Sequence, residues 1–303
     1  MLQHVKSKSA DGTQLRFMWL EITGRCQLEC AHCYASSGPS GTHGRMTRDS
    51  WARVIEDAAG LGVPSLQFIG GEPTLHPDLP RLIELAVEYN MEVEVFSNLA
   101  YVTPALWDTF SQTGVSLATS WYSDNPNEHT AITNRNSFNS TKTNIAEAVR
   151  RDIPIRVGII GINEDQRVEQ ARQILIDLGV KEDSIGYDDL RQVGRGIRDA
   201  KPGPDQLCGH CADGVLAISP EGEVWPCVFS RFMPLGNVLE QPLSDLLEKQ
   251  VVKKARSQLI ELWEDNMVAC IPSKCEPQCP PRCSPACSPC APGNRCWPYY
   301  DED

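Results

Sequence analysis

The sequence predicts an α/β fold: a partial (β/α)6 barrel, TIM-like but incomplete, with a small cysteine-rich C-terminal extension. Short apolar segments alternate with amphipathic ones between residues 15 and 190, and this alternation favours a parallel sheet with right-handed helical crossovers. Six such units fall short of a closed barrel, so we expect an open one with ligands at the carboxyl ends of its strands. The pattern changes after residue 190, which divides the chain into residues 1–190 and 191–303.

The elements of the first part follow one another in alternation. Apolar runs predict strands at 15–22, 65–69, 91–97, 115–121, 153–160 and 184–190. Amphipathic segments predict helices at 48–60, 79–89, 104–113, 141–151 and 165–178. Thr103 is a cap ahead of Pro104 at the start of the third helix, and Gly60, Gly114 and Gly179 mark helix ends.

The second part has a different composition. Residues 191–206 are polar and rich in Gly and Arg, which predicts a linker. Residues 207–227 predict a hairpin with its turn at "SPEG", and residues 243–262 predict a helix. The last thirty or so residues are dominated by Cys and Pro, and proline at that density excludes a regular helix or inner strand. A disordered, Pro-rich, metal-binding tail is one interpretation of that segment.

Composition narrows the classes of function. The 303 residues carry a formal net charge of −12, which argues against nucleic acid or an anionic membrane as the main partner. No apolar h-region opens the chain and no apolar run approaches the ~18 residues of a membrane span, so we expect a cytoplasmic protein. The 13 cysteines then indicate metal binding or chemistry, because disulfides are uncommon in that compartment.

A first group of cysteines, "CQLECAHCY", follows the first predicted strand. Cys26, Cys30 and Cys33 have the spacing C-x3-C-x2-C. Three thiolates on one loop can hold three irons of a cubane iron–sulfur cluster and leave the fourth iron open. A structural zinc site would need a fourth ligand. His32 is the candidate, although its adjacency to Cys33 makes joint chelation awkward.

A second motif, "FIGGEPTLHPDL", ends the second predicted strand. Gly70 and Gly71 remove side chains, so that a ligand can approach the backbone. Glu72 adds a carboxylate suited to a ligand ammonium, and Pro73 stiffens the turn. A strand–turn–helix corner with an exposed glutamate is the alternative interpretation.

Together the two motifs resemble those of the radical S-adenosylmethionine (radical SAM) superfamily, in which C-x3-C-x2-C follows the first strand and a GGE-type motif ends the second. The resemblance covers about residues 13–190. It implies that Cys26, Cys30 and Cys33 hold a [4Fe–4S] cluster whose open iron binds S-adenosylmethionine. An electron from a reductant such as flavodoxin or ferredoxin would cleave that cofactor to a 5′-deoxyadenosyl radical, which abstracts a substrate hydrogen.

The resemblance also implies further contacts to S-adenosylmethionine. The Gly70–Gly71 backbone and Glu72 would take the methionine ammonium, and the backbone of Tyr34 would touch the adenine. Polar residues at the ends of the third and fourth strands, an arginine before a helix and an apolar residue of the fifth strand would meet the ribose, the carboxylate and the adenine. These residues are Ser97, Asn98, Ser120, Arg135 and Ile160. Each polar one has an ordinary alternative role as a cap, turn or surface residue.

A second set of cysteines resembles the SPASM or twitch extension, which holds one or two auxiliary iron–sulfur clusters. "GRG" at 194–196 precedes this set as it does in such proteins. The candidate ligands are Cys208, Cys211, Cys227, Cys287, Cys290 and Cys296, and the chain then ends without the last cysteine of the pattern. Cys270 would complete the first auxiliary site, or stay free as a hydrogen-atom donor of the kind some radical epimerases use. A zinc knuckle is the alternative for the C-x2-C pair.

The resemblance implies an enzyme of oxidoreductase or epimerase type that modifies a ribosomally made natural-product peptide. The short stretch before the first strand leaves no room for a fused leader-binding domain, so we expect a separate leader-peptide-binding partner. A small-molecule enzyme, such as an aminoglycoside or nucleoside epimerase or dehydrogenase, is the alternative substrate class. A non-catalytic iron–sulfur or zinc protein for electron transfer or metal storage is the alternative of another class.

Overall fold

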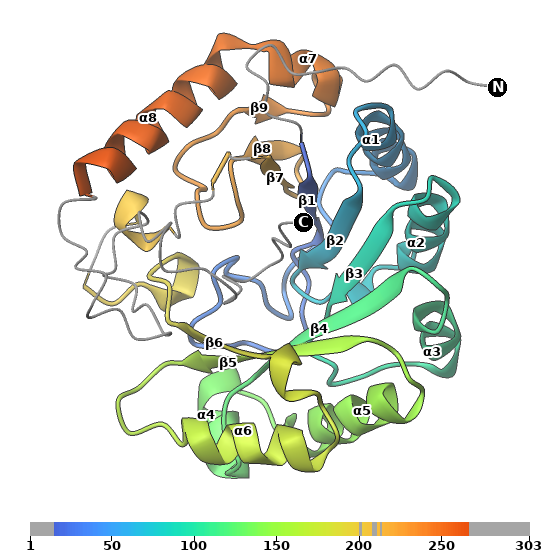
Figure 1. Ribbon diagram of the computed structural model, residues 1–303, viewed down its shortest axis with the longest axis vertical. Helices are drawn as coiled ribbons and strands as arrows, with labels where there is room; N and C mark the ends of the chain where they lie inside the picture. The colour runs from blue at the N-terminus through green and yellow to red at the C-terminus, as the bar shows by residue number, and fades with distance from the viewer. Residues whose placement is uncertain (1–14, 200–201, 208–210, 213, 267–303) are drawn as a thin grey trace.

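The computed structural model describes residues 15–199, 202–207, 211–212 and 214–266. Within these ranges one sheet of order β6-β5-β4-β3-β2-β1-β7-β8-β9 curves into an open barrel (Figure 1). The six predicted strands are β1 (Phe17–Thr23), β2 (Ser65–Gly70), β3 (Glu92–Phe96), β4 (Val115–Trp121), β5 (Ile155–Gly161) and β6 (Ile185–Asp189). All of them pair in parallel, which confirms the predicted α/β partial barrel.

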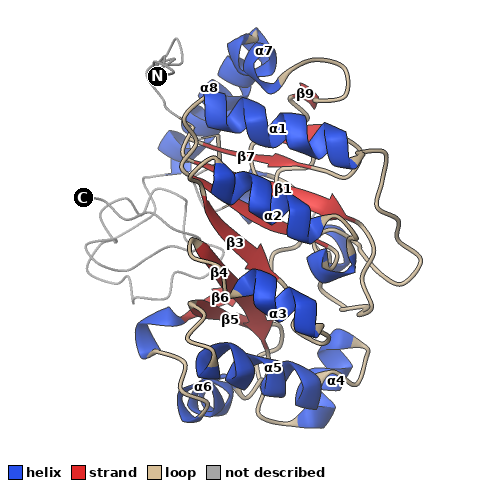
Figure 2. Ribbon diagram, turned by 90° about the vertical axis from the view of Figure 1, so that its right-hand side faces the viewer, coloured by secondary structure: helices blue, strands red, loops and turns tan. Residues whose placement is uncertain are grey.

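Helices cover the outer face of this sheet and return the chain from one strand to the next (Figures 1 and 2). They are α1 (Arg48–Gly60), α2 (Leu79–Glu88), α3 (Pro104–Phe110), α5 (Phe138–Arg150) and α6 (Val168–Asp177). Thr103 accepts a hydrogen bond from the Leu106 N–H and so caps α3 as predicted. The faces of α1 and α2 that bear Trp51, Ile55, Leu82 and Ile83 are buried in the main core.

Helix α4 (Pro126–Thr133) was not predicted from the sequence. It is one of two helices between β4 and β5, and its sequence "PNEHTAIT" has little apolar periodicity. Its ends nevertheless carry the usual signals: Asn125 accepts from the Asn127 N–H at the start, and Asn134 adopts a left-handed conformation (φ 53°) at the end. The helix matters for the site because its last turn contacts the cysteine loop.

The C-terminal part continues the same sheet. β7 (Val215–Ile218) pairs in parallel with β1, and β8 (Glu223–Trp225) completes the predicted hairpin before β9 (Gly236–Asn237). The predicted linker contains the short 3-10 turns η3 (Gly194–Gly196) and η4 (Pro204–Gln206). The predicted helix at 243–262 is two helices, α7 (Leu243–Glu248) and α8 (Gln250–Asn266), because Lys249 between them is extended (φ −70°, ψ 147°). The division at residue 190 stays a prediction.

Two apolar clusters hold these elements together. The larger one lies between the sheet and its outer helices. The smaller one, hereafter the inner cluster, is built around Phe17, Trp19, Trp225, Cys211 and Cys227. Every residue of β1 is buried, as expected for a central strand covered on both faces. No helix among the described residues is long and apolar enough to cross a membrane.

Candidate active site

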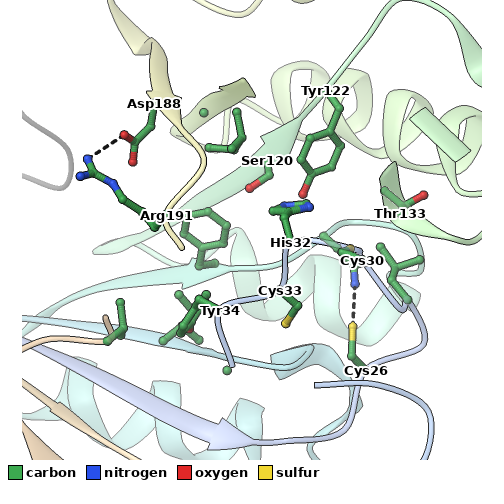
Figure 3. A pocket seen from close by; sticks show the side chains of 18 of the residues that line it. Cys26, Cys30, His32, Cys33, Tyr34, Ser120, Tyr122, Thr133, Asp188 and Arg191 are labelled. Atoms are coloured by element: carbon green, nitrogen blue, oxygen red, sulfur yellow. Dashed lines mark hydrogen bonds and ion pairs between the residues drawn. The ribbon is translucent and has the colours of Figure 1, made fainter. Parts of the chain in front are cut away.

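The three cysteines of the first group lie on the loop that follows β1, hereafter the cysteine loop (residues 24–37). Cys26 is buried and Cys30 and Cys33 are half-buried. All three line a cavity of about 260 Å³ at the carboxyl ends of the parallel strands (Figure 3). This is where an open α/β barrel is expected to bind its ligands.

The end of α4 holds the cysteine loop in place. The Glu29 N–H donates to the Thr133 carbonyl (3.2 Å) and the Ala31 N–H donates to the Ile132 carbonyl (3.0 Å). The last carbonyls of a helix have no partner within the helix, so the loop satisfies groups that α4 leaves open. The side-chain amide of Asn134 adds a bond to the Glu29 carbonyl (2.9 Å).

The thiols of Cys26 and Cys30 are largely shielded from solvent. Burial is the main reason that the pKa values of Cys26 and Cys30 are raised to about 12, and neighbouring acidic groups add to it. Asn98 Nδ2 donates toward Cys26 Sγ at 3.6 Å. No three His, Cys, Asp or Glu side chains in the described ranges are placed to hold one metal ion. Three thiols disposed around a cavity fit a cubane cluster with three of its four irons bound to thiolates, and loading it would release the thiol protons.

His32, the candidate fourth zinc ligand, packs against an aromatic ring. Its imidazole lies edge-on to Tyr122 with the ring centres 5.1 Å apart. Burial lowers the pKa of His32 to about 4, so the ring is neutral at pH 7. Both rings line the cavity (Figure 3).

The glycine pair at the end of β2 is needed by the chain itself. Gly70 has φ +126°, and a Cβ there would lie 2.5 Å from the Thr23 carbonyl oxygen. A Cβ on Gly71 would lie 2.3 Å from the Arg25 carbonyl oxygen. Both glycines line the cavity, and their approach to a ligand stays a prediction. The space that a side chain would take is filled by the end of β1 at Gly70 and by the start of the cysteine loop at Gly71. Their absence of side chains therefore lets the two motifs meet.

Glu72 is fully buried, which excludes the exposed glutamate of the alternative interpretation. Its Oε1 accepts from the Thr74 N–H (3.0 Å), the Thr74 hydroxyl (2.7 Å) and the Ser97 hydroxyl (2.8 Å), and its Oε2 accepts from the Asn98 N–H (2.8 Å). Burial raises the pKa of this carboxyl and the bonds oppose the shift. Glu72 thus fixes the turn that presents the Asn98 side chain to the cavity.

The structure divides the residues predicted to contact S-adenosylmethionine into two sets. The cavity is lined by Tyr34, Gly70, Gly71, Asn98, Ser120 and Ile160. The residues that do not line it are Glu72, Pro73, Ser97 and Arg135. Arg135 lies half-exposed and pairs with Glu29 of the cysteine loop at 3.0 Å. Its predicted contact with the methionine carboxylate, like the other individual contacts, stays a prediction.

Several cavity residues were not predicted. Arg156 of β5 forms a two-pronged ion pair with buried Glu94 of β3 (2.5 and 2.6 Å), and Gln67 of β2 also donates to Glu94. Arg156 and Gln67 line the cavity. These residues could have been found in the sequence as polar residues within apolar strands. Alternate residues of a barrel strand face inward, so a polar residue there can face the cavity. On the side away from Cys26, Asp188 and Arg191 form a 2.8 Å ion pair at the cavity wall (Figure 3).

Two cysteines of the second set lie in the inner cluster. Cys211 and Cys227 are buried with their sulfurs 2.9 Å apart. The residues after Cys227, Val228 and Phe229, line the cavity, so this part of the extension forms one of its walls. Cys208, Cys270, Cys287, Cys290 and Cys296 lie outside the described residues.

Both parts of the chain match models of known protein families. The model of the radical SAM superfamily matches residues 20–174, and the model of the SPASM iron–sulfur cluster-binding domain matches residues 208–290. A PqqA peptide cyclase of Ruegeria pomeroyi is 36% identical over 101 residues, which are 32% of this chain and 26% of that protein. The chain thus spans about a quarter of the length of the first relatives it matches.

Longer matches have lower identity. The antilisterial bacteriocin subtilosin biosynthesis protein AlbA of Bacillus subtilis is 25% identical over 293 residues, covering 84% of this chain and 64% of that protein. The structure of Streptococcus suis SuiB bound to its precursor peptide SuiA superposes with a TM-score of 0.67 at 13% identity, covering 80% of this chain and 66% of that one. At such identity this likeness shows the fold alone.

Proposed function

The chain belongs to the radical SAM superfamily and carries a SPASM-type extension, and from this membership we propose that it is an enzyme that modifies a ribosomally made peptide. The observation that carries the proposal is the convergence of Cys26, Cys30 and Cys33 on one cavity with the glycine pair of β2. When bound there, a [4Fe–4S] cluster and S-adenosylmethionine supply a carbon radical able to remove a substrate hydrogen. The extension would hold one or two auxiliary clusters.

The chain's own residues would bind the cluster and S-adenosylmethionine and shield them from water. The cysteine loop supplies the thiolates, and Asn98 and Ser120 offer hydrogen bonds inside the cavity. Aromatic side chains from both parts of the chain keep water away from the centre, which strengthens polar interactions inside it. These are Trp19, Tyr34, Phe96 and Phe229.

A peptide substrate is supported by the kinds of protein the chain resembles. One relative is named a peptide cyclase, a second acts in bacteriocin biosynthesis, and a structural neighbour was solved with its precursor peptide. At the cavity wall, the Asp188 carboxylate and the Arg191 guanidinium offer an acceptor and donors of the kind that peptide groups bind. The proposal includes an oxidoreductase or epimerase outcome, a flavodoxin or ferredoxin reductant, a separate leader-binding partner and a cytoplasmic location.

The test is anaerobic incubation in D₂O of the reconstituted protein, S-adenosylmethionine, dithionite and a panel of precursor peptides, read by mass spectrometry. We expect one peptide to lose two hydrogens, which marks oxidation or bond formation, or to gain one deuterium without other mass change, which marks epimerisation. An aminoglycoside or nucleoside that changes while every peptide stays intact would contradict the peptide substrate. Absence of S-adenosylmethionine cleavage with any substrate would contradict the enzyme itself.

A further inference from the structure

The segment predicted as a linker crosses the cysteine loop. Arg195, at the centre of η3, binds three of that loop's carbonyl groups. Its backbone N–H donates to the Cys33 carbonyl (2.9 Å), its Nε donates to the Cys30 carbonyl (2.9 Å), and its Nη2 donates to the Ser37 carbonyl (2.6 Å). A half-buried arginine therefore spans the loop from its second cysteine to its end.

The two glycines beside Arg195 bring its backbone close enough to make these bonds. Gly194 has φ +60°, and a Cβ there would lie 2.2 Å from the Tyr34 carbonyl oxygen and 2.5 Å from that of Cys33. A Cβ on Gly196 would lie 2.5 Å from the Arg191 carbonyl oxygen of its own segment and 3.3 Å from the His32 carbonyl oxygen of the cysteine loop. The "GRG" sequence thus has a local physical reason: the cysteine loop leaves no room for a side chain at Gly194, and the turn of the segment itself leaves none at Gly196.

Arginine suits this position because its planar guanidinium stays charged and presents several donors in a fixed fork. A lysine ammonium on a flexible stem would reach one carbonyl well but would not hold two in a set geometry. The guanidinium also places a fixed positive charge beside the backbone of Cys30, the second of the three cysteines. Hydrogen bonds and net charge near a cluster are among the factors that set its reduction potential.

We propose that Arg195 is a positioning residue that clamps the cysteine loop in the conformation in which its thiols face the cavity. Since Arg195 lies near the start of residues 191–303, ahead of the second set of cysteines, the clamp also ties the cluster-binding loop to the start of the auxiliary-cluster region. The proposal rests on the cluster-binding part of the proposed function and is independent of the peptide substrate.

The experiment compares Arg195→Gln and Arg195→Lys with Arg198→Gln. Arg198 is the matched control, because it lies exposed three residues on and donates to the carbonyls of Arg195 (3.3 Å) and Ile197 (3.4 Å) within its own turn. In each reconstituted protein, the cluster of the cysteine loop is identified as the one whose EPR signal changes when S-adenosylmethionine is added. Its rate of iron loss to a chelator and its reduction potential are then measured.

We expect Arg195→Gln to lose iron from that cluster about tenfold faster than wild type, as for the loss of one charge-assisted hydrogen bond. Its potential should fall, because no fixed cation then stabilises the added electron. Arg195→Lys should keep most of the potential but recover iron retention only in part, and Arg198→Gln should match wild type in both.

Equal iron retention and equal potential in Arg195→Gln and Arg198→Gln would overturn the proposal. If Arg195→Gln does not fold, Arg195→Lys decides the matter: wild-type retention there overturns the clamp, and faster iron loss supports it. A wild-type protein that loads no cluster responsive to S-adenosylmethionine would overturn the proposed function and this inference with it, so the two failures are distinguishable.

Discussion

Replacing Arg231 by methionine should destabilise the protein by leaving a carboxylate buried without its cation. Glu21 lies on β1 with 2% of its surface exposed, and Arg231 Nη2 lies 2.5 Å from each of its carboxylate oxygens. The same guanidinium lies over the rings of Trp225 (4.6 Å) and Tyr34 (5.4 Å). Arg231 follows Cys227 in the chain, so this pair joins the extension to the strand that leads into the cysteine loop.

The expected cost of Arg231→Met is about 3–5 kcal/mol in the free energy of unfolding, the usual range when one partner of a buried pair is removed. The pair should also leave a signature in the pH dependence. Burial raises the pKa of Glu21 even with Arg231 present, and removal of the cation raises it further. An acid with a raised folded-state pKa loses stability as pH rises through that value, so the cost should shrink as the solution is acidified and Glu21 takes up a proton.

The assay is urea unfolding of the cluster-free protein at about pH 7.5 and pH 5. Arg45→Met is the matched control, because Arg45 pairs with Glu221 at 3.1 Å across the same junction, with both side chains largely exposed (66% and 48%). That exposed pair should be worth about 0–1 kcal/mol. The double variant Glu21→Leu/Arg231→Met should recover most of the loss. A cost no larger than the control's, or no recovery in the double variant, would refute the reasoning.

Two further predictions concern the region around the cysteine loop. Burial lowers the pKa of His129 to about 4, so in wild type stability should fall as pH drops from about 6.5 toward 4, where only the unfolded chain is protonated. His129→Gln should remove about 1–2 kcal/mol of the difference in unfolding free energy between pH 7 and pH 5, and an unchanged difference in urea titrations would count against this. Gly71→Ala should cost about 1–3 kcal/mol in stability and lower the iron bound by the cysteine loop, because its Cβ would lie 2.3 Å from the Arg25 carbonyl oxygen. Gly60→Ala, whose Cβ meets nothing within 4 Å, is the control, and equal iron content in the two variants would show that the close approach is unimportant.

The sequence was informative where local pattern determines structure. Six parallel strands and the helices between them were predicted because a buried strand and an amphipathic helix each have their own apolar period. Helix α4 was missed because eight mostly polar residues carry little periodicity. The pairing of β7 with β1 was missed because it joins segments almost 200 residues apart, and the sequence of neither strand indicates which strand it pairs with.

The same distinction holds for the site. Cys26, Cys30 and Cys33 were predicted because cluster ligands are close together in the chain, and the structure brings all three to one cavity. The contacts of residues 194–196 with the cysteine loop were not predicted. A polar, Gly-rich sequence is typical of a linker and does not indicate which segment it contacts. Glu72 was predicted as a ligand contact, which stays a prediction; the four hydrogen bonds that its carboxylate accepts within the protein were not foreseen. The burial of a side chain and its hydrogen-bond partners depend on tertiary structure, so the spacing of residues in the sequence does not predict them.

The central claim is that the cysteine loop binds the cluster that cleaves S-adenosylmethionine. The direct measurement is 5′-deoxyadenosine formation, together with iron and sulfide content, in the anaerobically reconstituted wild type and in the Cys26/Cys30/Cys33→Ala triple variant. We expect the wild type to form 5′-deoxyadenosine, and the triple variant to form none while keeping the iron of its C-terminal cysteines. Formation of 5′-deoxyadenosine at the wild-type rate by the triple variant would contradict it.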